Sequence, residues 1–315
     1  GRIVPVGDLT DDEAVARIRA EAIDILVDLK GHTGGSRVQI LNRLTAPVHV
    51  AWLGFPGSTV NVDLDYIIAD PTVLPDDDLR FYHEQPVRLP VCYQPNDPVH
   101  RPIPLTAARK YLGLPESQFV FASFNAARKI TPQTLELWAE ILRKAEASVL
   151  WVMIDGDQAR QNFLRRITSL GVDAARIVFA ANVDYAQHIA RLQAADLGLD
   201  SFPYNGHTTT SDMLWAGLPV LTKKGRNFAS RVSESLLAAC GLRDLVAGDE
   251  DDFVQTAIAL AHGERRLEDW RNQLNDHRLS LALFDSERFC RDLERAYEAM
   301  AARAKAGLPP APIDL

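Results

Sequence analysis

Cysteine is scarce in this sequence of 315 residues, which contains only Cys92, Cys240 and Cys290. The three lie far apart and form neither a Cys-x-x-Cys pair nor a Cys/His spacing, so the pattern indicates no disulfide framework and no zinc site. Each thiol is most simply explained as a small side chain that is buried or half-buried.

Long apolar runs are lacking too. No run approaches the roughly 18 to 20 residues that a membrane-spanning helix needs. The first residues, GRIVPVGDLTDDEA, lack the charged, apolar and small-residue order of a signal peptide. No Gly-x-Gly-x-x-Gly follows any expected strand, which argues against a dehydrogenase. We therefore expect a cytoplasmic protein without a membrane partner.

Positive charge is in deficit, because the formal net charge is −8. A nucleic-acid-binding surface needs clustered Lys and Arg, so we expect no nucleic-acid partner and a local site for any phosphate. The acidic clusters at 11–13, 76–78 and 249–252 could hold a metal ion, but each lies at an expected helix start or turn. Solvated carboxylates near the positive end of a helix are the simpler interpretation.

Expected strands and helices alternate through most of the chain, which predicts an α/β fold in which helices cover parallel sheets. The chain is too long for one core, so we expect two lobes. Residues 70–104 carry many prolines and few periodic runs, and we interpret them as the crossing between the lobes. The predicted domains are therefore 1–104 and 105–315, the second including the C-terminal helices.

Local signals predict the elements of each domain. In the first, Thr10 and Glu13 form a capping box before a helix, and the buried strand IDILVDLKG follows. VQILNRL is helix-like, and VHVAWLGFPG and DYIIAD are β-rich. In the second, the helix TPQTLELWAEILRKA has Thr131 as its cap and Pro132 at its first position. The other segments of the second domain are the expected strands FVFASF, SVLWVMI, RIVFAA, DLGLDS and PVLT and the expected helices QARQNFLRRITSLG, YAQHIARLQAA, TSDMLWAGL, RVSESLLAACG and DSERFCRDLERAYEAMAARAKAG.

The segment NGHTTT, residues 205–210, follows the expected strand DLGLDS and precedes a helix. Ligands of parallel sheets collect at the carboxyl ends of strands. Here the backbone N–H groups of residues 206–209 and the Thr hydroxyls would lie at the positive end of the helix, where an anion binds without a metal. The alternative is that Thr208 or Thr210 merely caps the helix. Capping explains one Thr but not the whole segment, so we favour a phosphate site.

Three further segments hold candidate ligand-binding residues. Lys129 lies in the loop after FVFASF, where an ammonium could meet the same phosphate, although most Lys side chains are simply exposed. His188 and Arg191 share one helix face, where an imidazole could stack on a base and a guanidinium could contact it. Asp212, on the next helix, could accept two ribose hydroxyls. By spacing alone, structural or exposed roles remain open for these residues.

Asp155-Gly-Asp157 has the Asp-x-Asp form with which some sugar transferases hold a divalent ion. It also fits a strand end followed by a helix cap at Asp157. We favour the cap, because no further carboxylate partner is evident and Lys129 with the helix start already supplies positive charge.

Nearly the whole chain resembles the catalytic region of the O-linked N-acetylglucosamine (O-GlcNAc) transferases, including bacterial homologues and SPINDLY-like glycosyltransferases. The specific match is NGHTT followed by D-x-LWAG-P, with independent support from GFPG and FN-x-x-x-K. The other matching segments are ILVDLKGHTGGSR, APVHVAWLGFPGS, DYIIAD, FNAARKITPQTLELWAEIL, SVLWVM, HIARLQAADLGLDSFPYNGHTTTSDMLWAGLPVLT and ASRV.

The resemblance implies two Rossmann-like lobes of the GT-B glycosyltransferase fold, a UDP-GlcNAc donor, no metal or other cofactor, and inversion at the anomeric carbon. The implied acceptor is a serine or threonine hydroxyl of a protein or peptide. Lys129 looks like the lysine that stabilises the leaving β-phosphate, and Asp212 looks like the ribose ligand. The other positions that match are Gly206, His207, Thr208 and Thr209 in the phosphate-binding turn, His188 and Arg191 on the uridine-binding helix, and Gly54, Phe55 and Pro56 in the sugar and acceptor cleft.

The chain also departs from the family. Ala126 replaces a common Gln near the lysine, and Tyr185 replaces a Lys before the uracil-stacking His, so donor affinity or sugar preference is expected to differ. An upstream segment with a His proposed as base, and the tetratricopeptide (TPR) repeats, would belong to the rest of a longer polypeptide, which leaves the N-terminal lobe incomplete here. His32 lies near the cleft but is not assigned as base. The alternatives are a same-fold transferase that uses another UDP-sugar or an Asn acceptor, and a non-catalytic UDP-sugar-binding module.

Overall fold

The computed structural model describes residues 2–43, 45–103, 106–263 and 266–315. The chain divides into two compact units, of which the first comprises Gly1–Pro95 with Glu287–Leu315 and the second comprises Asn96–Ser286. The predicted boundary between residues 104 and 105 lies outside the described residues. The C-terminal residues from Glu287 were expected with residues 105–286, whereas the structure groups them with the first unit.

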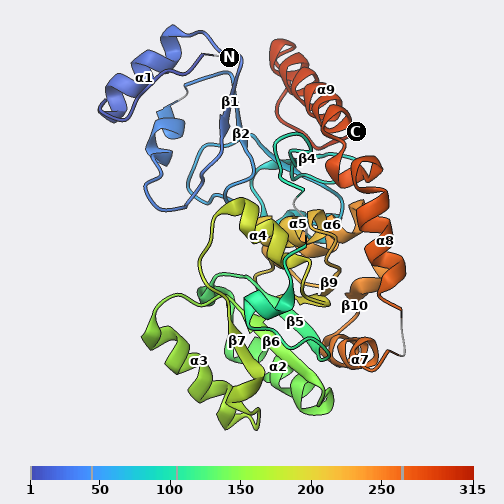
Figure 1. The fold of residues 1–315 in the computed structure, drawn as a ribbon. Coiled ribbons are helices and arrows are strands. Elements are labelled where there is room, and N and C mark those ends of the chain that lie inside the picture. Colours follow the sequence, from blue (N-terminus) through green and yellow to red (C-terminus); the bar gives the residue numbers. More distant parts are fainter. Residues whose placement is uncertain (1, 44, 104–105, 264–265) are drawn as a thin grey trace. The chain divides into compact units, whose positions relative to one another are not determined.

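The first unit is built on a five-stranded parallel sheet with the order β1-β2-β3-β4-β11 (Figure 1). Before this sheet comes helix α1 (Asp11–Ala20), and the predicted capping box between Thr10 and Glu13 is present. VQILNRL forms a 3₁₀ helix at Val38–Arg43, and strand β4 was not anticipated. The strands are β1 (Ile25–Asp28), β2 (Val48–Ala51), β3 (Tyr66–Ala69), β4 (Gln85–Arg88) and β11 (Ile313–Asp314).

Helix α9 (Ser286–Lys305) explains why the C-terminal residues belong to the first unit. Ala296 and Met300 are fully buried in one apolar cluster with Val48, Val50 and other residues of the first sheet. The chain then returns as strand β11, which pairs with β4, and Asp314 accepts a hydrogen bond from Arg88. This assignment depends on burial between distant segments, which the local helix pattern does not specify.

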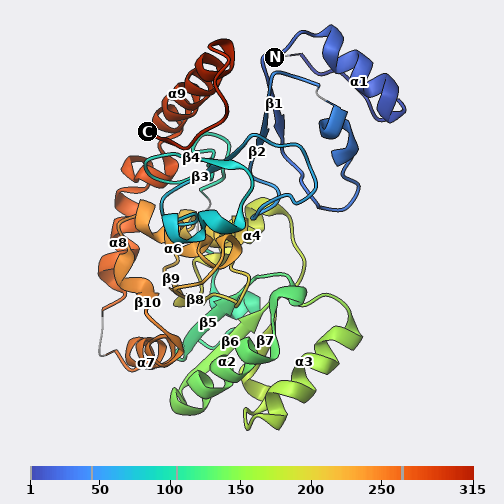
Figure 2. The same ribbon diagram turned by 180° about the vertical axis from the view of Figure 1, so that it is seen from behind.

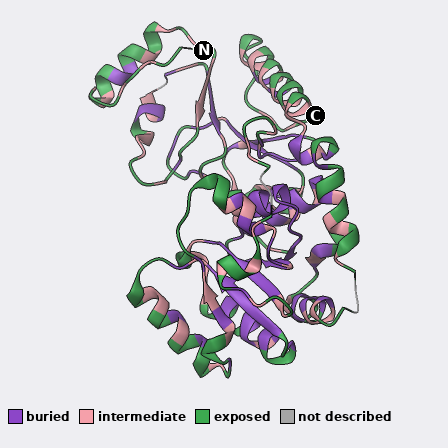
Figure 3. Ribbon diagram, viewed as in Figure 1, coloured by how far each residue is buried: buried purple, intermediate pink, exposed green. Residues whose placement is uncertain are grey.

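The second unit contains a six-stranded parallel sheet with the order β10-β9-β8-β5-β6-β7 (Figures 1 and 2). The chain order therefore reverses between β5 and β8, and in such sheets ligands bind beyond the carboxyl ends of the strands at this switch point. β6 is buried throughout, and β5 is buried from Val120 onward (Figure 3). The strands are β5 (Phe119–Ser123), β6 (Ser148–Val152), β7 (Ile177–Phe179), β8 (Leu197–Leu199), β9 (Val220–Lys223) and β10 (Val246–Ala247).

Helices pack against this sheet, as α2 does on β6 and as α5, α6 and α7 do on β9. The predicted cap at Thr131 and the Pro132 start are confirmed. The helices are α2 (Pro132–Lys144), α3 (Asp157–Ser169), α4 (Tyr185–Leu192), α5 (Thr208–Trp215), α6 (Val232–Ala239), α7 (Glu250–Ala261) and α8 (Glu268–Asp276). The two parallel sheets confirm the predicted α/β class.

The Asp155-Gly-Asp157 segment lies where β6 leads into α3, but the predicted cap at Asp157 is wrong. Gly156 occupies the N-cap position with φ of 83°, and Asp157 is the first helical residue. A carboxylate in the first turn still interacts favourably with the helix dipole. Among the described residues, no helix is long and apolar enough to span a bilayer.

Met300→Ala tests the packing of α9 in the first unit. Removing a fully buried side chain leaves a cavity, so we expect the free energy of unfolding to fall by about 2 to 5 kcal/mol. Glu298→Ala, at an exposed position of the same helix, is the matched control and should have little effect. Chemical denaturation measures both. Equal stabilities for the two variants would contradict this packing.

Candidate functional site

Two loops meet at the switch point of the second unit. One follows β5 and carries Asn125 and Lys129; the other follows β8 and leads into α5. The Lys129 ammonium donates a hydrogen bond of 2.7 Å to the carbonyl oxygen of Asn205, and its Nζ lies 4.2 Å from the centre of the Tyr204 ring. Lys129 and the start of α5 are therefore brought together, as the sequence predicted.

The first turn of α5 exposes backbone donors. Its N-cap is His207, whose side chain makes no capping hydrogen bond within the described part of the chain. Ser211 N–H makes the helical hydrogen bond to His207 O, so the N–H groups of residues 208–210 precede the helical ladder. Gly206 differs from the prediction, because its N–H donates to the Asp200 carboxylate at 2.7 Å. The backbone N–H groups that could bind an anion therefore lie after Gly206 in the sequence.

The Thr side chains of this turn connect neighbouring elements. The Thr209 hydroxyl donates to the Asn125 side chain at 2.5 Å, and the Thr210 and Ser233 hydroxyls lie 2.9 Å apart. Thr208 is exposed. The alternative in which Thr208 or Thr210 caps α5 is wrong, because both lie inside the helix and His207 holds the cap position.

Burial controls the charges around this turn. It lowers the pKa of Lys129 to about 8, while the Asp200 carboxylate opposes this shift and Arg128 adds to it. Burial and the nearby Lys129 charge lower the pKa of His207 to about 3. His207 is thus a neutral imidazole at pH 7; its ring stacks on Tyr204, and its Nε2 lies 3.3 Å from Ala229 O. Lys129 supplies the positive charge at this end of α5.

His188 and Arg191 are in direct contact on α4. Arg191 Nε donates to His188 Nδ1 at 3.1 Å, which places the proton of the neutral ring on Nε2. Burial, with the Arg191 charge, lowers the pKa of His188 to about 4. The Arg191 guanidinium also lies 4.9 Å from the centre of the Phe124 ring and hydrogen bonds to Ala181 O. The pair presents a neutral imidazole beside a buried cation.

Asp212 on α5 connects to α4 through Tyr185. The Tyr185 hydroxyl donates to Asp212 Oδ1 at 2.9 Å, and Arg101 Nη2 lies 3.4 Å from the same oxygen. Burial raises the pKa of Asp212, and the Arg101 charge opposes this shift. Burial beside Asp212 also raises the pKa of Tyr185 to about 12. Asp212 thus joins the α4 residues to the turn that faces Lys129.

Gly54, Phe55 and Pro56 belong to the first unit, where they follow β2. A Cβ on Gly54 would lie 2.0 Å from Leu29 O, so only glycine allows this close approach. The Phe55 ring meets His32 edge to face at 5.5 Å. The structure therefore brings the predicted cleft residues next to His32 in this unit.

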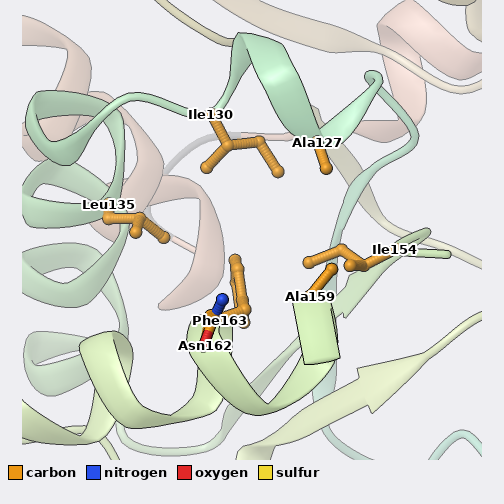
Figure 4. Close-up of a pocket in the computed structure, with 7 residues that line it drawn as sticks. All are labelled: Ala127, Ile130, Leu135, Ile154, Ala159, Asn162 and Phe163. Carbon is orange, nitrogen blue, oxygen red and sulfur yellow. The ribbon is translucent and has the colours of Figure 1, made fainter. Parts of the chain in front are cut away.

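A separate apolar pocket of about 270 Å³ lies beside the turn that carries Lys129. Figure 4 shows side chains from the segment before α2, from α2, from the loop after β6 and from α3 facing a shared space. Its described lining is Ala127, Ile130, Leu135, Ile154, Ala159, Asn162 and Phe163, and none of these is charged. It is therefore not the anion site.

Comparison with known proteins shows to which family the chain belongs. The family model for glycosyl transferase family 41 matches residues 7–101 and 94–293. The chain belongs to glycosyl transferase family 41. Curated relatives include a probable UDP-N-acetylglucosamine–peptide N-acetylglucosaminyltransferase SEC of Arabidopsis thaliana, 34% identical over 94% of this chain and 31% of that protein. A probable transferase of the same description, SPINDLY of Eustoma exaltatum subsp. russellianum, is 35% identical over 92% of this chain and 32% of that protein.

A solved structure is similar over nearly the whole chain. A mutant of the Thermobaculum terrenum O-GlcNAc transferase matches with a TM-score of 0.88 and 31% identity, over 95% of this chain and 57% of that one. This match confirms the predicted GT-B fold. The chain spans about a third of the length of its curated family 41 relatives.

Sequence reasoning missed several residues of this candidate site. Asn125 and Asp200 hold the two loops together, and Arg101 reaches Asp212 from a segment interpreted only as a crossing. An acidic residue directly after a central parallel strand was the available signal for Asp200. Within the described residues, no group of three His, Cys, Asp or Glu side chains could hold a metal ion. That the family 41 site works without a metal stays a prediction.

The neutral state of His188 predicts how stability depends on pH. Its pKa is about 4 in the folded protein and 6.5 in a model compound, so the unfolded chain binds a proton first as pH falls. The free energy of unfolding should therefore decrease from about pH 6.5 towards pH 4. His188→Gln removes this contribution and should make the slope less steep, while the contribution of His207 remains; denaturant unfolding across this range measures the slope. An unchanged slope would show that His188 titrates in the folded protein as in the unfolded one.

Proposed function

We propose that this chain is the catalytic part of an inverting, metal-independent glycosyltransferase that moves N-acetylglucosamine from UDP-GlcNAc to Ser or Thr hydroxyls of proteins. Family 41 membership and the printed names of the relatives support the reaction class. One observation carries the proposal: the Lys129 ammonium lies 2.7 Å from Asn205 O, beside the start of α5. A cation and a helix start together form a site for a diphosphate.

The reaction is a single displacement. The acceptor hydroxyl oxygen forms a bond to the anomeric carbon from the face opposite UDP, and the bond from that carbon to the β-phosphate oxygen breaks. The hydroxyl proton passes to a base, which we do not assign. The electron pair of the broken bond leaves with UDP, so negative charge grows on the β-phosphate in the transition state.

Lys129 and the start of α5 are placed to accept that charge. An ammonium has three donors, and within the described residues one is used on Asn205 O, so the other two are proposed to bind phosphate oxygens. The N–H groups of Thr208 and Thr209 add the positive end of the helix. These groups are held before the donor arrives, which is why they can lower the barrier.

The remaining residues are proposed to bind the donor. Asp212 would accept ribose hydroxyls, and His188 with Arg191 would contact the uracil ring. Tyr185 already donates to Asp212, so ribose must share that carboxylate with it. Because these contacts involve parts of the donor that do not react, they contribute to affinity more than to turnover.

The acceptor side belongs to the same proposal. Gly54, Phe55 and Pro56 would line the cleft for the sugar and the acceptor, and the rest of a longer polypeptide, with TPR repeats, would select the acceptor protein. No metal or other cofactor is required, because Lys129 and the helix start supply the positive charge. A chelator should accordingly leave the rate unchanged.

Lys129→Ala in the full-length protein tests the proposal. Loss of one preorganised donor to the leaving group should reduce kcat with UDP-GlcNAc by about 10² to 10³. UDP affinity, measured by calorimetry, should change much less. Arg128→Ala removes the adjacent exposed cation and is the matched control, which should keep most of the activity. Transfer to a Ser/Thr acceptor peptide is followed by mass spectrometry.

The outcomes separate the alternatives. Unchanged kcat in Lys129→Ala would refute the leaving-group role. A preference for UDP-glucose or an Asn acceptor in the wild-type protein would indicate another same-fold transferase. UDP binding without transfer or donor hydrolysis in the full-length protein would indicate a non-catalytic module.

The pKa of Lys129 predicts an alkaline limit to activity. The ammonium is the active form, so kcat/KM, which reports the free enzyme, should be full below about pH 8 and fall above it. Bound diphosphate favours the ammonium, so the fall in kcat should come at higher pH. Steady-state rates from pH 6 to 10 measure the fall in kcat/KM and the fall in kcat. A kcat/KM that stays flat to pH 10 would contradict the assignment.

A further inference from the structure

Asp200 is a charged side chain that the proposed reaction does not use, although it lies next to the site. It follows β8 directly, and 1% of its surface is exposed. Its Oδ1 accepts hydrogen bonds from the N–H groups of Ser201 and Gly206, at 2.8 and 2.7 Å. Its Oδ2 accepts one from the Thr222 hydroxyl at 2.7 Å. A buried carboxylate is costly unless such bonds satisfy it.

The partners of Asp200 favour its ionised form. The two backbone N–H groups can only donate, and Asn125 Nδ2, at 3.4 Å, is a donor as well. A proton on Oδ1 would lie where these donors already point, whereas Oδ2 faces the Thr222 hydroxyl, which can donate or accept. Burial is the largest effect and raises the pKa of Asp200 above its usual value, and the hydrogen bonds from Gly206, Thr222, Ser233 and Ser201 oppose this shift. The geometry is that of an anion held by donors.

These bonds also fix the path of the loop between β8 and α5. The Gly206 N–H bond spans six residues and closes the segment from Asp200 to the start of α5. Asn125 extends the network, because its side chain donates to the Ser201 hydroxyl at 3.0 Å and accepts from Thr209. A Cβ on Gly206 would lie 2.4 Å from Thr210 Oγ1, so the turn is closely packed. The network joins the loop after β5 to the loop after β8.

We propose that Asp200 is a positioning residue of the UDP-sugar site: its buried carboxylate accepts the hydrogen bonds that shape the loop before α5, and this loop presents Asn205 O to the Lys129 ammonium. This inference rests on the proposed function of Lys129. The contact that Lys129 makes, Asn205 O, lies within the loop that Asp200 closes. Asp200 thus acts through other groups and touches neither sugar nor phosphate.

The charges around Lys129 make this role measurable. Asp200 is the anion that raises the pKa of Lys129, against burial and against Arg128 from its own turn. The other titratable groups that face it are Tyr204 and the neutral His207. Removal of the Asp200 charge should therefore move the deprotonation of Lys129 to lower pH. A residue that only filled space would not produce that shift.

The test is Asp200→Asn in the full-length protein, with Lys129 titrated directly in the absence of UDP-GlcNAc. Acetic anhydride acetylates only the neutral amine, so the pH dependence of Lys129 acetylation, read by peptide mass spectrometry, gives its deprotonation midpoint. We expect the midpoint to fall below the wild-type value of about 8. Each unit of that fall should lower kcat/KM at alkaline pH about tenfold.

Two further variants make the result decisive. Asp70→Asn alters a carboxylate that is also fully buried and accepts backbone N–H bonds, but in the first unit; it should leave the Lys129 midpoint unchanged. Thr222→Val removes a donor to Asp200 with little change of shape, and it should move the midpoint in the same direction by less. If Asp200→Asn does not fold, the Lys129 midpoint of Thr222→Val tests the inference.

A midpoint that stays at the wild-type value in the folded Asp200→Asn and Thr222→Val proteins would overturn the inference. The titration needs no transferase activity, so it is independent of the proposed function. An inactive wild-type protein whose Lys129 midpoint still depends on Asp200 would refute the proposed function alone.

Discussion

The site depends on one contact: an ammonium from the loop after β5 bonds to a carbonyl of the loop after β8. The bond between Lys129 and Asn205 forms because these two strands are neighbours at the point where the strand order reverses. Parallel strands place their carboxyl ends at the same edge, so the two loops meet there. The Lys129 ammonium and the positive end of α5 therefore lie close together. Their repulsion is unfavourable unless an anion lies nearby.

Burial sets the protonation states of the groups around this turn. It lowers the pKa of Lys129, where the Asp200 carboxylate opposes the shift, and it keeps His207 and His188 neutral. In a medium less polar than water, each charge acts more strongly on its neighbours. A diphosphate would restore the balance of charge. The same balance explains how positive charge could be supplied at the leaving group without a metal ion.

Local signals allowed much of the fold to be predicted from sequence. The Thr10–Glu13 capping box, the Thr131 cap and the strands around the switch point each depend on residues a few positions apart. The proximity of Lys129 to the turn before α5 was predicted because both segments follow expected strands, at their carboxyl ends, and because of the family resemblance. What sequence could not provide depended on distant partners: α9 packs on the first sheet, and Arg101 reaches Asp212. A local sequence pattern does not predict which buried groups come into contact when they are a hundred or more residues apart in the sequence.

A crystal structure with UDP tests the central claim most directly. We predict that the β-phosphate lies within hydrogen-bonding distance of Lys129 Nζ and of the N–H groups of Thr208 and Thr209, with uracil beside His188 and ribose on Asp212. Phosphates bound away from Lys129, or held by a divalent cation between them and the protein, would contradict the account.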